Sequence, residues 1–329
     1  MLRAYRRRAA PRPGERVYRG AVRFDISVPQ RVAGGFDACA TRDYLIRAEA
    51  LGFTGAWTLE QTIGPSPLLA PLEMLAWAAA HTERIRLGVA VLVTSLHEPL
   101  QLASAVTAVD HLSHGRLDLG VAPGGGTRKF AAFGVERATF VGNFTEGLEL
   151  MKAAWSDEPK VTFHGRFRDV DGLPIQPKPV QRPHPPLWFG ANVPRAIARA
   201  VRHGDAFLGA GSSTTAAFAE AVRTVHHELA EQRRDAEDFT VGKRVYLIVD
   251  DDPLRARERV LAGLRRIYGG MAGIDEVPVS GTPADVVRGL RDVVDAGAEM
   301  LLLNPVGEDV SEDREQMERL AAEVIPQLK

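Results

Sequence analysis

The sequence is poor in the features that mark secreted, membrane and metal-binding proteins. Among 329 residues there is one cysteine, Cys39, so the chain can form no internal disulfide and no CxxC metal site, and we expect this residue to pack in the core. No uninterrupted apolar run is long enough to cross a bilayer, and the nine histidines show no HxH or HExxH spacing. The sequence therefore favours a protein of the reducing cytoplasm that holds no metal.

Charge of one sign is also lacking. The formal net charge is -1, which gives no overall attraction to nucleic acid or to an anionic membrane, and we expect neither as a partner. Only the start of the chain is strongly basic, because arginines crowd residues 1–20 between prolines and a glycine. This segment is expected to be a poorly ordered arm, although a transit peptide or a nucleic-acid tail is an alternative reading.

The rest of the chain, residues 21–329, alternates short β-rich runs with amphipathic helical stretches. Strands separated by helices favour parallel pairing through crossover connections. Eight such runs predict an α/β fold of the closed (β/α)8 type, a TIM barrel, as a single domain, with a doubly wound open sheet as the alternative. The runs are 22–28, 55–60, 85–93, 117–122, 186–191, 205–211, 244–250 and 299–306.

The helices have clear patterns and boundaries. Leu102, Val106, Val109 and Leu112 recur at helical spacing and predict one buried face. Later in the chain, the run GTPAD at 281–285 predicts a helix start, because it offers a capping threonine, a proline in the first turn and an acidic residue after it.

Two segments interrupt the regular spacing of these elements. The first is an insertion after the fourth strand, at about 126–185, which holds a helix-like run at 145–155 and a hairpin-like run at 160–172. Insertions of this size usually lie over the mouth of a barrel, so we expect this one to cover it. The second is the glycine-rich segment 269–273, which predicts either a lid or a plain connector.

The most informative run is the strand LDLGVA at 117–122, which opens into Pro123, Gly124, Gly125 and Gly126. Ligands of α/β folds bind at the C-terminal ends of strands, and glycines let the backbone approach a flat ring or a phosphate closely. This run predicts the floor of a cofactor site. An ordinary flexible loop is the alternative interpretation.

Several segments together resemble the bacterial luciferase-like monooxygenases. They include AEALGFTGAWTLEQ (48–61), AAAHTERIRLGVAVL (78–92), AVDHLSHGRLDLGVAPG (108–124), 149–191, and VSGTPADVVRGLRDVVDAGAEMLLL (279–303). The resemblance implies a (β/α)8 oxidoreductase that uses reduced FMN or the deazaflavin F420 on a small organic substrate. It also implies a homodimer and a separate flavin or F420 reductase as partner.

The resemblance places the cofactor ring against the third and fourth strands. It implies a non-prolyl cis peptide bond between Ala90 and Val91, although such a bond costs about 3–4 kcal/mol and the residues alone favour trans. Ala122, Pro123, Gly124 and Gly125 match the loop beneath the ring edge.

The resemblance also implies positions for the cofactor tail and its phosphate. A helix beginning near residue 194 would direct free N–H groups at a phosphate, and Asn192 either assists or caps that helix. The residues after the sixth strand likewise either hold a phosphate or cap a helix. The positions concerned are Gly190, Ala191, Asn192, Gly211, Ser212 and Ser213.

The chain departs from the family pattern at the proposed catalytic positions. Many relatives place an acid and a histidine at the end of the second strand, whereas this chain has Glu60 followed by Gln61, which can only exchange hydrogen bonds. Glu60 remains the candidate for proton transfer, unless it pairs with an arginine. His97 either supplies the absent histidine or starts a surface helix. Gly125 stands where some F420 enzymes carry a catalytic glutamate, which argues against a sugar-phosphate dehydrogenase.

Two other functions fit the same residues. A non-catalytic flavin-binding protein would explain the missing histidine. A cofactor-free lyase or hydrolase would use Glu60 as an acid or base.

Overall fold

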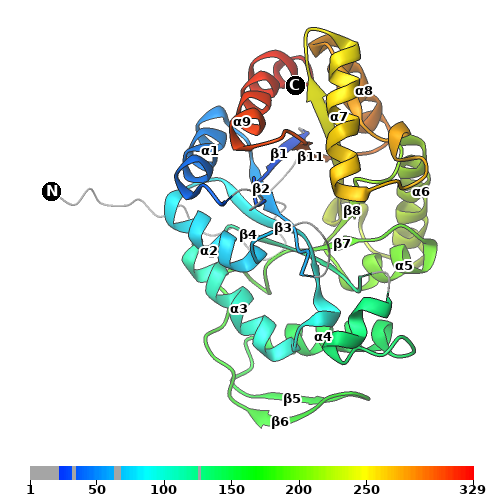
Figure 1. Cartoon of the computed structure of the whole chain (residues 1–329). Coiled ribbons are helices and arrows are strands. Elements are labelled where there is room, and N and C mark those ends of the chain that lie inside the picture. The colour runs from blue at the N-terminus through cyan, green and yellow to red at the C-terminus, as the bar shows by residue number, and fades with distance from the viewer. Residues whose placement is uncertain (1–21, 32–34, 63–67, 125–126) are drawn as a thin grey trace, which may run out of the picture.

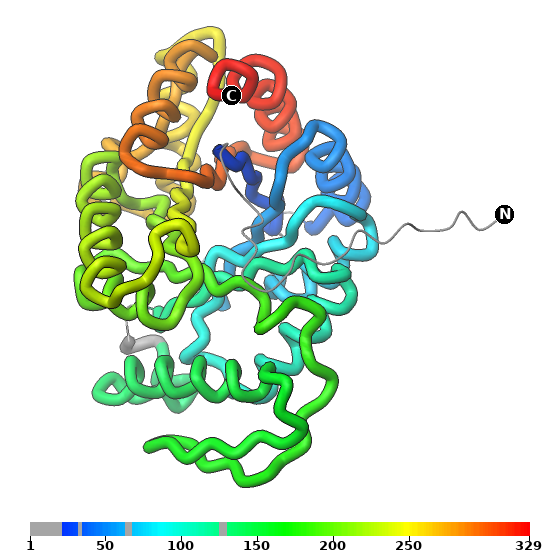
Figure 2. Tube along the Cα trace, turned by 180° about the vertical axis from the view of Figure 1, so that it is seen from behind, coloured from blue at the N-terminus to red at the C-terminus, as the bar shows by residue number. Residues whose placement is uncertain are grey.

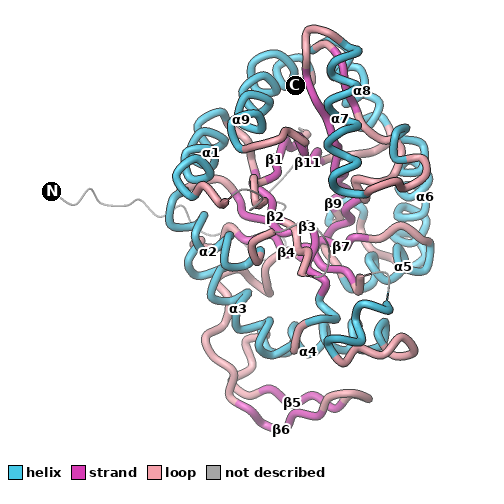
Figure 3. Tube along the Cα trace, in the orientation of Figure 1, coloured by secondary structure: helices cyan, strands magenta, loops and turns pink. Residues whose placement is uncertain are grey.

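The computed structural model describes residues 22–31, 35–62, 68–124 and 127–329, so the predicted basic arm and Gly125 lie outside the described residues. Eight parallel strands form a ring with helices outside it (Figures 1 and 3). The strands of the ring are β1 (Arg23–Ser27), β2 (Gly55–Thr58), β3 (Arg86–Val93), β4 (Leu117–Ala122), β7 (Leu187–Gly190), β8 (Ala206–Gly209), β9 (Thr240–Val249) and β11 (Met300–Pro305).

The ring is closed by hydrogen bonds between β8 and β9, which lie at opposite ends of an otherwise continuous parallel order. This pairing rules out the open doubly wound sheet and confirms the predicted (β/α)8 TIM barrel. The view from behind in Figure 2 shows the same ring. Each of the eight predicted runs contains or overlaps one strand of the barrel.

Nine α-helices surround the barrel in the part of the chain that the structure describes. They are α1 (Ala38–Leu51), α2 (Pro71–His81), α3 (Pro99–Leu112), α4 (Phe140–Trp155), α5 (Pro194–His203), α6 (Thr215–Glu231), α7 (Pro253–Tyr268), α8 (Pro283–Asp295) and α9 (Val310–Arg319). The predicted start of α8 is confirmed, since Thr282 and Asp285 form a reciprocal capping box. No helix within the described ranges has both the length and the apolar character that a membrane span requires.

Two predictions about buried side chains are wrong. In α3, Leu102, Val106 and Val109 are buried, but Leu112 is 58% exposed. Asp110 is buried at that end of the helix instead, because its carboxylate accepts hydrogen bonds from the backbone of the proline-rich segment that follows the hairpin. Cys39 is exposed, since it lies in the first turn of α1, whose buried side chains come from other positions.

The half of the barrel nearest the strand N termini is filled by side chains. Trp57 and Trp188 meet edge to face, with ring centroids 5.5 Å apart, and Arg23 lies over both rings. Asp25 accepts a hydrogen bond from Trp57 Nε1 at 2.6 Å. Gly88 of β3 makes room for this layer, because a Cβ atom there would lie 2.3 Å from Trp57. This half of the barrel interior therefore has no room for a ligand.

The insertion after β4 has two parts with different surroundings. Its helix α4 is one of the barrel's outer helices, and Phe144 packs edge to face on Phe189. The hairpin of β5 (Val161–His164) and β6 (Asp169–Leu173) confirms the hairpin-like run. The hairpin packs on the outer side of α4 and extends away from the barrel in Figure 1, so this part of the insertion lies away from the mouth. Phe140 and Val141, at the start of α4, are the residues of the insertion that lie at the strand ends.

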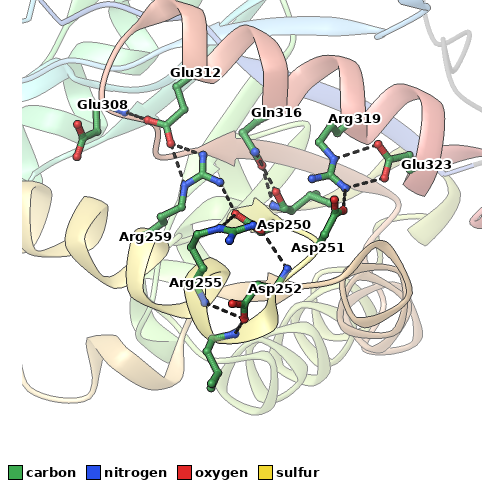
Figure 4. Close-up of polar contacts among 12 residues, drawn as sticks. Asp250, Asp251, Asp252, Arg255, Arg259, Glu308, Glu312, Gln316, Arg319 and Glu323 are labelled. Atoms are coloured by element: carbon green, nitrogen blue, oxygen red, sulfur yellow. Dashed lines mark hydrogen bonds and ion pairs between the residues drawn. The ribbon is translucent and has the colours of Figure 1, made fainter.

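An ion-pair network joins α7 to α9 beyond the end of β9 (Figure 4). Asp250 accepts hydrogen bonds from Arg255 and Arg259, and Arg259 also pairs with Glu312 of α9. The hydrogen bonds from Arg255 hold the pKa of Asp250 well below its usual range. The network fixes α7 beside the short strand β10 (Val279–Gly281), which extends the sheet at the end of β9.

Candidate functional site

A cavity of about 510 Å³ lies at the C-terminal ends of β3, β4, β7 and β8. Its volume is within the range of small-molecule sites, and its position is where TIM barrels bind their ligands. A second space of about 580 Å³ lies between α4 and the hairpin, away from the strand ends. We therefore place the candidate site in the cavity at the strand ends.

Ten of the twelve residues that the sequence placed at a cofactor line this cavity. They are Ala90, Val91, Ala122, Pro123, Gly124, Gly190, Ala191, Asn192, Gly211 and Ser212. Gly125 lies outside the described residues. Ser213 is not among the lining residues, because its hydroxyl turns back to donate to the carbonyl of Ala210 at 2.8 Å.

The floor of the cavity is backbone and small side chains. The bond between Ala90 and Val91 is cis, as the family resemblance implied, and the register between β3 and β4 shifts at this point. Gly190 faces the same place, because a Cβ atom there would lie 3.2 Å from a methyl group of Val91. These residues leave a surface with no polar side chain, on which a flat ring can lie.

Arg244 of β9 reaches across the mouth to the opposite strand. Its Nη2 atom donates to the carbonyl of Ala90, while its buried Nε atom has no hydrogen-bond partner among the described residues. Among the described residues that line the cavity there is no aspartate or glutamate. The guanidinium therefore brings a positive charge to the cavity wall, fixed by its contact with Ala90.

Two further arginines lie at the edge of the cavity, on the first turns of α5. Arg195 and Arg199 both line it and make no ion pair with any residue in the described ranges. Partial burial lowers the pKa of Arg199 from its ordinary value. The N-cap of α5 is Val193, with no side-chain cap, so the alternative interpretation of Asn192 as the N-cap is wrong. An uncapped helix N terminus beside two arginines suits a phosphate.

The loop after β8 is held from behind by Lys243 of β9. The buried Nζ atom donates to both the carbonyl and the hydroxyl oxygen of Ser213 at 2.9 Å, and to the carbonyl of Ala210. Thr214 caps α6 by accepting from the backbone of Ala217. Thr214 is therefore the residue that caps α6, and Gly211 and Ser212 line the cavity.

Tyr268, the last residue of α7, closes one side of the cavity. Its hydroxyl lies 2.9 Å from that of Tyr246, and burial raises its pKa above the ordinary value. Tyr246, Trp57 and Trp188 are buried and do not line the cavity, so they are core residues.

The three residues expected to carry catalysis lie outside the cavity lining. Glu60 is almost fully buried, and its Oε1 atom lies 2.7 Å from His97 Nε2. It pairs with His97 and not with an arginine. None of Glu60, Gln61 and His97 lines the cavity. The pair is connected to the floor only through the backbone. Glu60 accepts a hydrogen bond from the N–H of Val93 at 2.6 Å, and two residues further along the chain Ser95 donates a hydrogen bond to the carbonyl of Pro123 in the floor, also at 2.6 Å.

The sequence did not predict the three arginines that line the site. Arg195 and Arg199 follow a predicted helix start at a spacing of four residues, and Arg244 is a charge within an apolar strand. Both patterns were visible, but neither shows which way the side chain points. In the described ranges, no group of three or more His, Cys, Asp or Glu residues is arranged to hold a metal ion.

Comparison with known proteins agrees with this geometry. Over 321 residues the chain is 27% identical to an F420-dependent glucose-6-phosphate dehydrogenase of Kineococcus radiotolerans, covering 87% of this chain and 92% of that protein. Over 164 residues it is 29% identical to the oxygenase component of a flavin-dependent trigonelline monooxygenase of Acinetobacter baylyi, covering 48% and 44%. The chain spans about half the length of the first curated relatives it matches, two uncharacterized proteins of Sinorhizobium fredii.

Among solved structures, the monooxygenase RslO1 of Streptomyces bottropensis superposes with a TM-score of 0.79 at 22% identity, covering 93% of this chain and all of that one. This likeness concerns the fold. Residues 22–285 match the protein family described as luciferase-like monooxygenase. With its barrel, its cis peptide bond and this match, the chain belongs to the luciferase-like monooxygenase family.

Proposed function

We propose that the protein is an oxidoreductase that binds reduced FMN or F420 in the cavity and acts on a small organic substrate. The observation that carries the proposal is a backbone floor beside three arginines, with no acidic side chain among the described residues that line the cavity. Such a site suits a flat ring attached to a phosphate. The relatives named above use F420 in one case and flavin in the other, which supports both cofactors equally.

The residues present fit both the ring and the phosphate of such a cofactor. Ala90, Val91 and Gly190 would lie beneath the ring, and Arg195 and Arg199 at the N terminus of α5 would hold the phosphate. When bound, the cofactor would supply the redox chemistry, either hydride transfer or activation of O2. If FMN is used, a separate reductase would deliver it in reduced form.

Glu60 and His97 act in this proposal as positioning residues. Glu60 holds the end of β3 through Val93, and Ser95 holds the floor through Pro123. A hydrolase or lyase that uses Glu60 is disfavoured, because the carboxylate is nearly fully buried, is already hydrogen-bonded, and lies outside the cavity lining.

Anaerobic titration with F420, FMN and reduced FMN, followed by fluorescence, tests the proposal. Saturable binding of at least one cofactor, followed by its oxidation or reduction when organic substrates are added, is the expected result. Tight binding without turnover on any substrate would indicate a flavin-binding protein, and binding of none would contradict an oxidoreductase.

A further inference from the structure

A third and much smaller space lies apart from the cavity at the strand ends, between the turn that follows β3 and the helix α4. Its volume is about 20 Å³, and the buried side chains of Phe144, Leu148 and Met151 on α4 line part of it. Its polar lining consists of Thr94, Ser95, His97, Asn143 and Arg168. The described residues around this space do not line the cavity, so the space is separate from the proposed cofactor site.

The hydroxyl group of Thr94 points to a polar ligand in this space. Thr94 is 7% exposed, and its buried Oγ1 atom has no hydrogen-bond partner in the part of the chain that the structure describes. The other four buried threonines of that part each donate to a backbone carbonyl: Thr41, Thr58, Thr82 and Thr107. Because a buried hydroxyl without a partner is unfavourable, the exception at Thr94 indicates a partner that is not protein.

The neighbouring polar groups have hydrogen-bonding capacity left over. Ser95 donates its hydroxyl hydrogen to a carbonyl of the cavity floor, which leaves the oxygen able to accept. Asn143 Nδ2 has two hydrogens and donates one of them to a backbone carbonyl at 3.2 Å. His97 binds Glu60 through Nε2, which leaves the second ring nitrogen. A small molecule that both donates and accepts hydrogen bonds suits this lining.

The charges of the lining favour a neutral ligand over an ion. Its two basic side chains each face a carboxylate, since Arg168 Nε lies 3.5 Å from Glu98 and His97 Nε2 lies 2.7 Å from Glu60. The volume also sets a limit, because a site of about 10–15 Å³ with two to four polar partners is enough for one water molecule. A space of about 20 Å³ is too small for an organic ligand.

We infer that this space is a binding site for one internal water molecule, held by Thr94 Oγ1 and by the polar groups of Ser95, His97 and Asn143. The site goes beyond the proposed function and does not depend on any cofactor. The water joins two elements that both support the cavity: Ser95 lies in the turn that holds the floor, and α4 contributes Phe140 and Val141 to the cavity lining.

High-resolution crystal structures of the wild type, Thr94→Val and Thr94→Ser test the site directly. We expect density for one water within hydrogen-bond distance of Thr94 Oγ1 in the wild type and in Thr94→Ser, which keeps the hydroxyl, and none in Thr94→Val. Crystals grown with sodium bromide should show no anomalous peak there. Missing water density in the wild type, or a bromide peak in its place, overturns the inference and leaves the proposed function untouched.

Urea unfolding of Thr94→Val gives a second test, because valine keeps the shape of threonine and removes only the hydroxyl. If a water binds the hydroxyl, the variant loses that hydrogen bond, and the folding equilibrium constant should fall about five- to tenfold. A hydroxyl without any partner predicts the opposite, since its removal leaves stability unchanged or raises it. An unfolding midpoint at or above that of the wild type therefore overturns the inference. If Thr94→Val does not fold, the wild-type and Thr94→Ser crystals decide.

Discussion

His97 Nε2 lies 2.7 Å from Glu60 Oε1, and the other oxygen of this carboxylate accepts a hydrogen bond from Val93 N at 2.6 Å. The two side chains come from different strand ends, 37 residues apart. Together they hold the end of β3, and Ser95, in the short helical turn that follows this strand, donates to the carbonyl of Pro123 in the cavity floor. The partner of Glu60 is thus a histidine that follows the neighbouring strand β3.

Glu60→Ala should destabilise the protein and loosen the cavity floor. The change leaves the N–H of Val93 unsatisfied and His97 without its partner, so the free energy of unfolding should fall by about 1–3 kcal/mol. Urea denaturation measures this effect. The matched control is Glu98→Ala, an exposed neighbour, which should change the free energy by less than about 0.5 kcal/mol. Equal stability of the two variants would contradict a positioning role for Glu60.

Arg199→Gln should weaken cofactor binding about tenfold or more. A hydrogen bond to a charged group contributes about 1.5–3 kcal/mol, and 1.4 kcal/mol corresponds to a factor of ten. Isothermal titration at two salt concentrations measures the loss and shows whether it is electrostatic. Arg202→Gln, on the same helix but outside the cavity lining, should bind like the wild type. If both variants bind normally, the phosphate does not lie at α5.

Lys243 should make stability depend on pH above neutrality. Its pKa is lowered to about 7 in the folded protein, mainly by burial, whereas an unfolded lysine titrates near about 10.4. Between these values the unfolded chain binds more protons, so the free energy of unfolding should rise with pH from about 7 to 10. Lys243→Met should flatten this rise, and the exposed Lys160→Met should not. Urea unfolding at several pH values would show an unchanged slope if Lys243 is not responsible.

Arg259→Met should weaken the contact between α7 and α9 in the network of Figure 4. Arg259 binds both Asp250 and Glu312, so its loss should lower the free energy of unfolding by about 1–3 kcal/mol. The lowered pKa of Asp250 adds stability that is present above pH 4 and lost as the pH falls below it. Thermal unfolding at pH 7 and pH 3 should therefore show a smaller difference between variant and wild type at pH 3. If the variant and the wild type differ equally at both pH values, the loss of stability does not come from the ion pairs.

The barrel could be predicted from the sequence because its signals are local. Each strand is a short apolar run, and the alternation with helices requires parallel pairing. The start of α8 could be predicted because both residues of its capping box lie within the run 281–285. By contrast, the burial of Asp110 depends on a segment 70 residues later in the chain, so no pattern within α3 could show it.

The sequence predicted the backbone segments that line the candidate site, but it did not predict the arginine side chains that lie beside them. A run of glycines at a strand end is a pattern that can be read from the sequence, whereas an arginine on a helix is usually solvated, so Arg195 and Arg199 gave no distinct signal. The contact of Arg244 with Ala90 depends on closure of the ring, which brings β9 opposite β3. The pairing of Glu60 with His97 was missed because the two residues lie 37 positions apart, in segments that only the pairing of β2 with β3 brings together.

A crystal structure of the protein with its bound cofactor tests the central claim most directly. We expect density for a flat ring against Ala90 and Val91, with the phosphate at the N terminus of α5 near Arg199. A cofactor bound elsewhere, or a cavity that stays free of it at saturating concentrations of both F420 and FMN, would contradict the account.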